Sequence, residues 1–327
     1  METRILGRTQ RPVSVVGLGT WQLGGDWGVV EDSDAMLILD AAVEAGVTLF
    51  DTADVYGDGR SERLIGSYLK SNPGVDVLVA TKMGRRAPLE PAEYRITNFR
   101  AWVDRSRRNL GVERLDLIQL HCPPTPVYSS AEVYDALDAL VQEGRVAAYG
   151  VSVETVDEAL TAIGWPHVAT VQIILNAFRQ RPLERVLPAA AEAGVGILAR
   201  VPLASGLLSG RYTHDTRFSD DDHRSYNRHG EAFDVGETFS GIPYDEGVEA
   251  AREFAALAPN GVTPAQLALR WVLDQPGVTS VIPGARNVQQ LRGNASAAAL
   301  PPLSNQLREQ VTSLYDRRIR PLIHSRW

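Results

Sequence analysis

Residues 47–57, VTLFDTADVYG, join a short apolar run to a polar segment. Two later segments, VDVLVATKMG at 75–84 and RLDLIQLHC at 114–122, have the same form. Short, continuous apolar runs of this kind are typical of strands that are buried on both faces of a parallel sheet. The three segments therefore predict three buried strands whose ends carry polar side chains.

Those polar side chains are Asp51, Tyr56, Lys82 and His121, each at or just past the end of its predicted strand. In a parallel barrel, the carboxyl ends of all strands lie on one face, which is where the chemistry takes place. We therefore expect an acid, a phenol, an amine and an imidazole to meet on that face and to act as the catalytic residues.

The alternation of apolar runs and helical segments continues along the chain. Residues 33–45 and 131–143 have the apolar spacing of helices that bury one side, and Ser33 is the expected N-cap of the first. Eight apolar runs with helical segments between them predict an α/β fold, a (β/α)8 TIM barrel, with residues 1–327 as a single domain. The runs are 13–18, 47–51, 77–81, 116–120, 146–151, 169–174, 195–200 and 278–282.

A doubly wound α/β sheet is the competing architecture. It usually carries a glycine-rich fingerprint after its first strand, with a third glycine close to the start of a helix. The first apolar run here leads into Gly17-Leu18-Gly19-Thr20-Trp21, which holds one Gly-x-Gly pair and no such third glycine. The sequence therefore favours the barrel.

Composition limits the partners and the location. The chain has 327 residues and a net charge of −7 with scattered basic residues, so we expect no nucleic-acid partner. A single cysteine, Cys122, excludes an internal disulfide, and METRILGRTQ at the N-terminus lacks the apolar core of a signal peptide, so we expect a cytoplasmic protein.

Gly164 and Pro166 interrupt the uncharged stretch 159–178, which predicts a helix end, a turn and a strand rather than a membrane span.

Residues 211–243 are polar, aperiodic and much longer than a usual connection between a strand and a helix. They follow the seventh predicted strand, at the end that faces the expected site. Two interpretations stay open for this segment, which is either a solvated surface excursion or a flap over the mouth of the barrel.

Lys82 and Tyr56 suggest a way to transfer a proton. A phenol has a pKa near ~10, and a neighbouring ammonium favours the phenolate. At ~4 Å and an effective dielectric of about 20 the attraction is on the order of 4 kcal/mol, which equals roughly three pK units. We therefore expect Lys82 to lower the pKa of Tyr56 by at most this amount, which would bring it to about 7, where a general acid works best. Asp51 would keep Lys82 charged, and His121 would hydrogen-bond a substrate oxygen.

The chain resembles the aldo-keto reductase family over essentially its whole length. The resemblance starts with RILGRTQRPVSVVGLGTWQLGG, which is similar to the family's N-terminal hairpin and first barrel strand. It continues, in order, through FDTADVYGDGRSERLIG, VATKMG, LDLIQLHCP, VAAYGVSV, VQIILNAFRQ, VPLASGLLSGRY and VIPGARNVQQLRGN. It implies a (β/α)8 barrel that reduces aldehydes and ketones reversibly with NADPH and without a metal. The family's catalytic tetrad falls on Asp51, Tyr56, Lys82 and His121.

The resemblance also implies a site for NADP(H) along the mouth of the barrel. The residues implied are Gly19, Thr20, Trp21 and Asp51 beside the nicotinamide, Ser152 and Gln172 at its carboxamide, Val201, Pro202, Leu203, Ser205, Gly206 and Leu207 along the pyrophosphate with Arg211 as a phosphate partner, and Gly284, Ala285, Arg286, Gln290 and Asn294 around the adenosine phosphate.

Some positions depart from the family pattern. Val153 stands where many members have Asn, which removes one contact to the carboxamide. Gly284 and Gln290 stand where many members have Lys and a second Arg, so Arg286 becomes the candidate for the 2′-phosphate, with capping of the last helices as the alternative. Arg200 stands where an aromatic ring often stacks on the nicotinamide. It either stacks and disfavours the oxidised, cationic ring, or points away to pair with an acid.

Aromatic side chains dominate the expected substrate pocket, which favours a small apolar or aromatic carbonyl compound. Arg86 either recognises an anionic tail or has a surface role. The residues expected at the pocket are Trp21, Trp27, Tyr56, Arg86, His121 and Tyr128.

Two other functions stay open, a regulatory barrel that binds NADP(H) as a sensor with little turnover, and a metal-dependent barrel hydrolase. The second is disfavoured because only His121, of six histidines, ends a predicted strand, whereas metal sites usually draw several ligands from strand ends. The expected partner is a small carbonyl substrate, with no metal, no membrane and no nucleic acid, and a homo-oligomer stays open.

Overall fold

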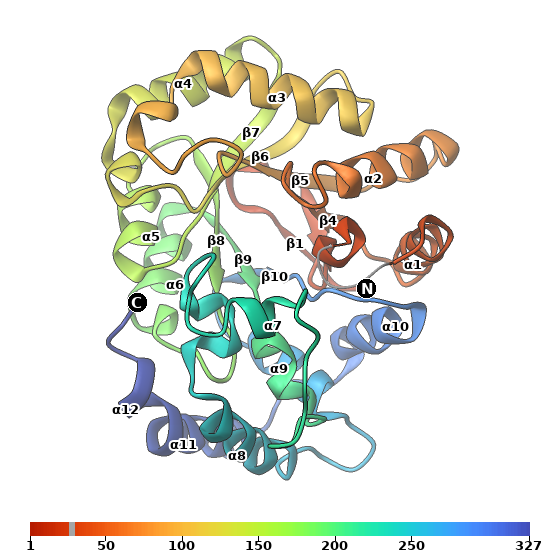
Figure 1. The fold of residues 1–327 in the computed structure, drawn as a ribbon, viewed down its shortest axis with the longest axis vertical. Coiled ribbons are helices and arrows are strands. Elements are labelled where there is room, and N and C mark those ends of the chain that lie inside the picture. Colours follow the sequence, from red (N-terminus) through yellow and green to blue (C-terminus); the bar gives the residue numbers. More distant parts are fainter. Residues whose placement is uncertain (26–29) are drawn as a thin grey trace.

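Eight parallel strands form the central sheet of the computed structural model, which describes residues 1–25 and 30–327 (Figure 1). The strands follow one another around the sheet in chain order, and parallel bridges from Val16 to Val281 and from Gly19 to Gly284 join its edges. The expected (β/α)8 barrel is thereby confirmed. Its strands are β3 (Leu18–Gly19), β4 (Leu49–Asp51), β5 (Leu78–Met83), β6 (Leu115–His121), β7 (Val146–Ser152), β8 (Val168–Ile174), β9 (Gly196–Arg200) and β10 (Val278–Val281).

Helices alternate with the strands and cover the outside of the barrel (Figure 1). They are α1 (Asp32–Glu44), α2 (Arg60–Ser71), α3 (Ile96–Leu110), α4 (Ala131–Gln142), α5 (Val156–Ile163), α6 (Pro182–Ala193), α7 (His223–Tyr226), α8 (Tyr244–Ala255), α9 (Pro264–Leu273), α10 (Val288–Ser296), α11 (Asn305–Leu314) and α12 (Arg320–Ile323). In the part of the chain that the structure describes, no helix combines the length and apolar character needed to cross a membrane.

The first predicted strand, 13–18, is divided in the structure. Its beginning belongs to β2 (Pro12–Ser14), which pairs antiparallel with β1 (Thr3–Ile5) as the N-terminal hairpin, and only its last residue belongs to β3. Ser14 and Thr48 exchange hydrogen bonds between side chain and backbone at 2.8 and 2.9 Å. These bonds replace the regular strand ladder at the point where the run divides.

The hairpin closes the amino end of the barrel. Leu6 and Val13 pack in one buried cluster with Leu49 and Leu78, the first residues of β4 and β5. Gly7 allows this close approach, because a Cβ atom at that position would lie 2.2 Å from backbone atoms of β8 and β9, and its φ is +47°. The opposite, carboxyl end of the barrel is left for a functional site.

A capping box begins α9, whereas the start of α1 differs from the expectation. Thr263 and Gln266 form this capping box, with the Thr263 hydroxyl accepting at 3.2 Å and the Gln266 side chain accepting at 2.9 Å. Pro264 occupies the first helical position of α9. The N-cap of α1 is Glu31, so the prediction of Ser33 is wrong by two residues, and no side chain makes a capping hydrogen bond there.

The Thr263→Ala variant should lose about 1 kcal/mol of unfolding free energy, since it removes the side-chain acceptor at the start of α9. Urea unfolding followed by circular dichroism measures this loss. Ser33→Ala serves as the matched control, and it should change stability by less than about 0.5 kcal/mol because Ser33 caps nothing. Equal losses from the two variants would contradict this assignment of the caps.

Candidate active site

The four side chains predicted to be catalytic lie together at the carboxyl ends of neighbouring strands. Asp51 ends β4, Lys82 is the last but one residue of β5, and His121 ends β6. Tyr56 lies in the connection between β4 and α2. Its ring packs edge to face against that of His121, with the ring centres 6.0 Å apart. The parallel order of the strands is what brings these side chains together.

Lys82 is the centre of this group and is buried, with its side chain 1% exposed. Its Nζ donates to Asp51 Oδ1 at 2.6 Å, to the carbonyl oxygen of Thr52 at 2.9 Å and to the hydroxyl of Tyr56 at 3.4 Å. These contacts use all three donors of an ammonium group. Burial lowers the pKa of Lys82, but the negative charge of Asp51 and the hydrogen bonds to Asp51 and Tyr56 outweigh it and raise that pKa above 10.5, so the ammonium is charged at neutral pH.

The pKa expected for Tyr56 is wrong in direction. Burial disfavours the phenolate and raises the pKa of Tyr56 above 10.0, while Lys82 lowers it by less and Asp51 and Glu237 raise it further. The expected value treats Lys82 as a free charge, whereas a carboxylate oxygen of Asp51 lies 2.6 Å from its Nζ and offsets that charge. Tyr56 is therefore a protonated phenol at neutral pH.

His121 is a neutral imidazole. Burial and the positive charges of Arg85, Lys82 and Arg200 hold its pKa well below 6.5. Its Nδ1 atom is buried and has no hydrogen-bond partner within the described ranges. A neutral imidazole carries one N–H donor, so His121 can orient a carbonyl oxygen through a hydrogen bond without protonating it.

A buried chain of hydroxyl groups supports the backbone beneath this site. Thr52 donates to Ser61 at 2.9 Å, the Ser61 hydroxyl lies 2.8 Å from that of Thr20, and Thr20 donates to the carbonyl oxygen of Asp51 at 2.8 Å. The hydroxyl of Thr20, expected beside the nicotinamide, thus holds the end of β4. This role of Ser61 was not predicted, although Ser61 is part of the quoted segment FDTADVYGDGRSERLIG.

Ser152 and Gln172, the residues expected at the carboxamide, lie beside His121 in the sheet. The register pairs His121 with Ser152, and Ser152 with Gln172, across β6, β7 and β8. Gln172 Nε2 donates to Asp51 Oδ2 at 2.7 Å, and Ser152 Oγ accepts from Cys122 Sγ at 3.4 Å. The amide of Gln172 therefore reaches across the barrel to the acid that holds Lys82, a contact that the sequence analysis missed.

The segment expected along the pyrophosphate has a strained backbone directly after β9. Val201, Ala204 and Ser205 have φ values of 51°, 48° and 54°, which residues other than glycine rarely adopt. Strain of this kind is typical of ligand-binding segments. The Ser205 hydroxyl donates to the carbonyl oxygen of Glu237 at 2.9 Å and accepts from the N–H of Phe239 at 3.0 Å. That hydroxyl therefore anchors the long loop and is not free to donate to a phosphate.

Arg211 and Arg286, the expected phosphate partners, are exposed, and neither forms an ion pair within residues 1–25 and 30–327. Gln290 accepts from the N–H of Arg286 at 2.8 Å, and Asn294 donates to a carbonyl oxygen of the same loop at 3.1 Å. The N-cap of α10 is Asn287, so Arg286 does not cap that helix. These side chains shape the loop, and the guanidinium of Arg286 has no ion pair in the part of the chain that the structure describes.

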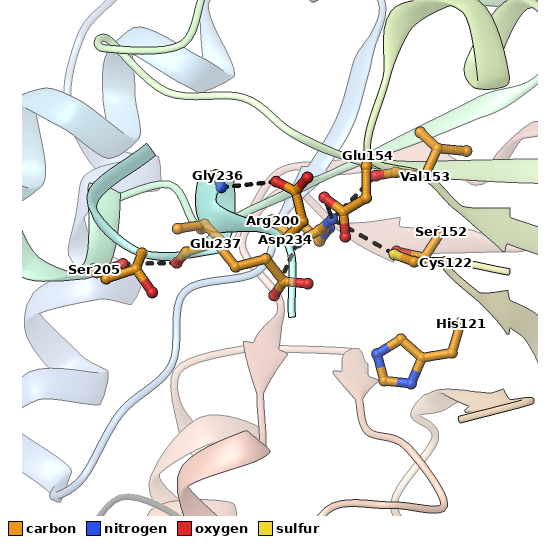
Figure 2. A network of polar contacts seen from close by, with 12 residues as sticks. His121, Cys122, Ser152, Val153, Glu154, Arg200, Ser205, Asp234, Gly236 and Glu237 are labelled. Carbon is orange, nitrogen blue, oxygen red and sulfur yellow. Dashed lines mark hydrogen bonds and ion pairs between the residues drawn. The ribbon is translucent and has the colours of Figure 1, made fainter. Parts of the chain in front are cut away.

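Arg200 pairs with acids (Figure 2), so the second of its two interpretations is the observed one. Its guanidinium lies 2.9 Å from Glu154 Oε2 and 3.2 Å from Glu237 Oε2, and it donates to the carbonyl oxygen of Val153 at 3.0 Å. Two carboxylates therefore balance its charge. The hypothesis that a stacked Arg200 disfavours the oxidised nicotinamide loses its basis.

Arg85 completes this network of buried charges. Its guanidinium lies 3.3 Å from Glu237 and 3.5 Å from Glu154, and its Nε donates to the carbonyl oxygen of His121 at 3.1 Å. Glu237 belongs to the segment 211–243, which is therefore tied to the strand ends that carry the site. The interpretation of this segment as a purely solvated excursion is wrong.

The same segment covers Trp21 at the mouth of the barrel. Trp21 stacks on Tyr56 with the ring centres 5.9 Å apart, and His223 and Phe233 lie 5.3 and 5.9 Å from Trp21. This placement agrees with the interpretation as a flap. The positions of His223 and Phe233 were not predicted, because an aperiodic segment gives no indication of which side chains turn inward.

The remaining residues expected at the substrate pocket have different positions. Trp27 lies outside the described residues. Tyr128 is fully buried and its hydroxyl donates to the carbonyl oxygen of Ser152 at 2.8 Å, so it supports the end of β7 instead of facing a pocket. Arg86 forms an ion pair with Asp58, in agreement with a surface role, and an anionic substrate tail would compete with that carboxylate.

Cys122, Glu154 and Glu237 place a thiol and two carboxylates within 4.8 Å of one another. Arg200 contacts both carboxylates and lies 3.6 Å from the thiol sulfur. A guanidinium thus stands where a metal ion would have to bind, and the group is better described as part of the charge network.

A parallel barrel with these side chains at its mouth is the structure of a (β/α)8-barrel enzyme. The Aldo/keto reductase family model matches residues 15–316 of the chain. Aldo-keto reductase YhdN from Bacillus subtilis is 31% identical over 297 residues, which cover 89% of this chain and 87% of that protein. The chain therefore belongs to the aldo-keto reductase family.

Solved structures of similar proteins agree with the fold. The glycerol dehydrogenase AKR11B4 from Gluconobacter oxydans superposes with a TM-score of 0.78 at 31% identity, covering 97% of this chain and 95% of that one. An aldo-keto reductase from Klebsiella pneumoniae, solved in complex with NADPH, superposes with a TM-score of 0.71 at 25% identity, covering 96% of each chain.

The Arg200→Met variant should be less stable than the wild type by about 3–5 kcal/mol, because it leaves buried carboxylates without their main counter-charge. Urea unfolding measures this difference in free energy. The double variant Arg200→Met/Glu237→Gln should recover part of the loss, since a carboxylate is removed together with the guanidinium. An Arg200→Met protein as stable as the wild type would contradict the network.

Proposed function

We propose that this protein reduces the carbonyl group of an aldehyde or ketone to an alcohol, reversibly, with NADPH. The observation that carries the proposal is the position of Lys82 Nζ, 2.6 Å from the carboxylate of Asp51 and 3.4 Å from the hydroxyl of Tyr56. Membership of the aldo-keto reductase family supports the same class of reaction. NADPH, when bound, supplies the hydride, and the chain supplies the proton and orients the carbonyl group.

Tyr56 is the proposed proton donor. Because its pKa is raised by burial, Tyr56 holds its proton at neutral pH and can hydrogen-bond the carbonyl oxygen. Negative charge that grows on this oxygen makes it more basic than a phenolate, so the proton moves from the phenol to the oxygen. The ammonium of Lys82, 3.4 Å away, then stabilises the phenolate that remains.

Asp51 and His121 position the reacting groups. Asp51 holds the ammonium of Lys82 in place and keeps it charged. The neutral imidazole of His121 lies against the ring of Tyr56 and provides a second hydrogen bond to the carbonyl oxygen. Two donors that converge on one oxygen fix its position and favour the build-up of negative charge on it.

The residues present fit NADP(H). The amide of Gln172 and the hydroxyl of Ser152 lie in register beside His121, where they can meet a nicotinamide carboxamide. Arg211 and Arg286 are exposed cations available to phosphate groups, and Arg286 is proposed to select NADPH through the 2′-phosphate. The relative from Klebsiella pneumoniae, solved in complex with NADPH, supports NADP(H) as the cofactor.

The proposed substrate is a small apolar or aromatic carbonyl compound. Trp21 stacks on Tyr56, and the flap places His223 and Phe233 against Trp21. Aromatic walls next to a few polar groups suit a planar apolar substrate. The ion pair of Arg86 with Asp58 argues against an anionic substrate tail.

The Tyr56→Phe variant should lower kcat by at least about 100-fold, since it removes the general acid. NADPH oxidation with aromatic aldehydes, keto-esters and sugars measures this loss, and NADPH fluorescence should show that cofactor binding is retained. Lys82→Met should lose turnover as well. Normal rates with Tyr56→Phe would refute the assignment, whereas tight NADPH binding by a wild type that turns over none of these compounds would indicate a sensor.

Carbonyl reduction should keep its rate up to about pH 9, because it needs protonated Tyr56 and burial raises the pKa of Tyr56 above 10.0. Alcohol oxidation needs the phenolate and should rise about tenfold per pH unit as that pKa is approached. Initial rates in both directions between about pH 6 and about pH 10 measure this asymmetry. If the rate of carbonyl reduction instead falls around neutral pH, Lys82 lowers the pKa of Tyr56 by more than burial raises it.

A further inference from the structure

Gln172 links the expected cofactor site to the proton donor through one buried amide. It lies in β8 and is 1% exposed. Its Nε2 donates to Asp51 Oδ2 at 2.7 Å, while Asp51 Oδ1 accepts from Lys82 at 2.6 Å. In the order of the eight-stranded sheet β8 lies four strands from β4, so this hydrogen bond spans the interior of the barrel.

The chemistry of Asp51 fixes which way the amide is turned. An ionised carboxylate only accepts hydrogen bonds, so the NH₂ end of Gln172 must face it. The amide oxygen of Gln172 has no hydrogen-bond partner among the residues that the structure describes. This oxygen is therefore left to accept a hydrogen bond from a ligand, and the NH₂ group of a nicotinamide carboxamide is a donor of the right kind.

The neighbours of Gln172 make it the main candidate among them for binding a nicotinamide carboxamide. Ser152 lies beside it in register, and its hydroxyl is in contact with Cys122. Val153, next in the chain, offers no polar side chain to a carboxamide. Of the pair expected at the carboxamide, Gln172 alone also contacts Asp51.

We propose that Gln172 is a positioning residue that couples binding of the nicotinamide carboxamide to the Asp51–Lys82–Tyr56 chain. The proposal rests on the function proposed above and goes beyond it by giving one amide two simultaneous partners. A ligand that engages the amide oxygen holds the NH₂ end on Asp51. Tyr56 is thereby held in position to donate its proton when the cofactor is bound.

The charge on Asp51 is the means of this coupling. The charged groups that act on Tyr56 are Lys82 from β5, Asp51 from β4 and Glu237 from the flap, and the imidazole of His121 beside it is neutral. The N–H dipole of Gln172 offsets part of the negative charge on Asp51. Removing that dipole leaves more negative charge near Tyr56, which makes the phenolate harder to form.

Gln172→Met tests the proposal, because methionine keeps similar length and removes the donor. We expect kcat at saturating NADPH to fall about tenfold and the ionisation of Tyr56 to move to higher pH. That ionisation is measured in the cofactor-free protein as the tyrosinate absorbance lost in a Tyr56→Phe background. If Gln172→Met does not fold, Gln172→Asn keeps an amide that is too short to reach Asp51 and should have the same effects.

Gln180→Met is the matched control, because Gln180 is also a buried glutamine, but its amide donates to the carbonyl oxygen of Ala177 at 2.9 Å and not to Asp51. It should leave the ionisation of Tyr56, NADPH binding and kcat at saturating NADPH as in the wild type. A Gln172→Met protein that changes only the NADPH dissociation constant would overturn the coupling and leave Gln172 a simple ligand. The tyrosinate titration needs no turnover, so it decides this point even if no carbonyl compound is reduced and the proposed function fails.

Discussion

A buried ammonium group needs a counter-charge, and the site is arranged around this constraint. Lys82 is 1% exposed, and an isolated charge at such a position would cost several kcal/mol. Asp51 supplies the opposite charge at 2.6 Å, and Thr52 and Tyr56 take the other two donors. The same bond that stabilises the ammonium removes much of its effect on Tyr56, which is why burial sets the protonation state of the phenol.

The same constraint applies to a second group of largely buried charges beside His121. Arg85 and Arg200 face Glu154 and Glu237, and Arg85 also donates to the backbone of His121. Because Glu237 lies in the flap, the ion pairs that balance these charges also hold the flap against the strand ends. This shared requirement connects a long polar segment to the strand ends on which the chemistry depends.

The local pattern of apolar and polar residues was enough to predict the barrel. It also predicted that the polar side chains at the strand ends lie together. In a parallel barrel the carboxyl ends of the strands lie on one face. Asp51, Lys82 and His121 could therefore be placed together from three apolar runs. The flap was harder, because the inward position of Glu237 depends on Arg200, 37 residues earlier, and on nothing in its own sequence neighbourhood. Burial could not be judged from sequence either.

Tyr56 and Tyr128 illustrate how burial decides such cases. Desolvation reverses the direction of the pKa shift expected for Tyr56. Tyr128, expected at the pocket, is fully buried with its hydroxyl on the backbone of β7. Both errors arise because a sequence gives the type of a side chain and its neighbours along the chain, but not the water that it loses on folding.

Lys82 and Tyr56 are proposed to act as one proton-donating unit. A double-mutant cycle of Lys82→Met and Tyr56→Phe on kcat/KM for carbonyl reduction separates a shared role from two independent ones. If the two residues form one unit, the double variant should be about as slow as the slower single variant. Losses that multiply, so that the double variant is slower by the product of the two single effects, would show that Lys82 and Tyr56 act independently.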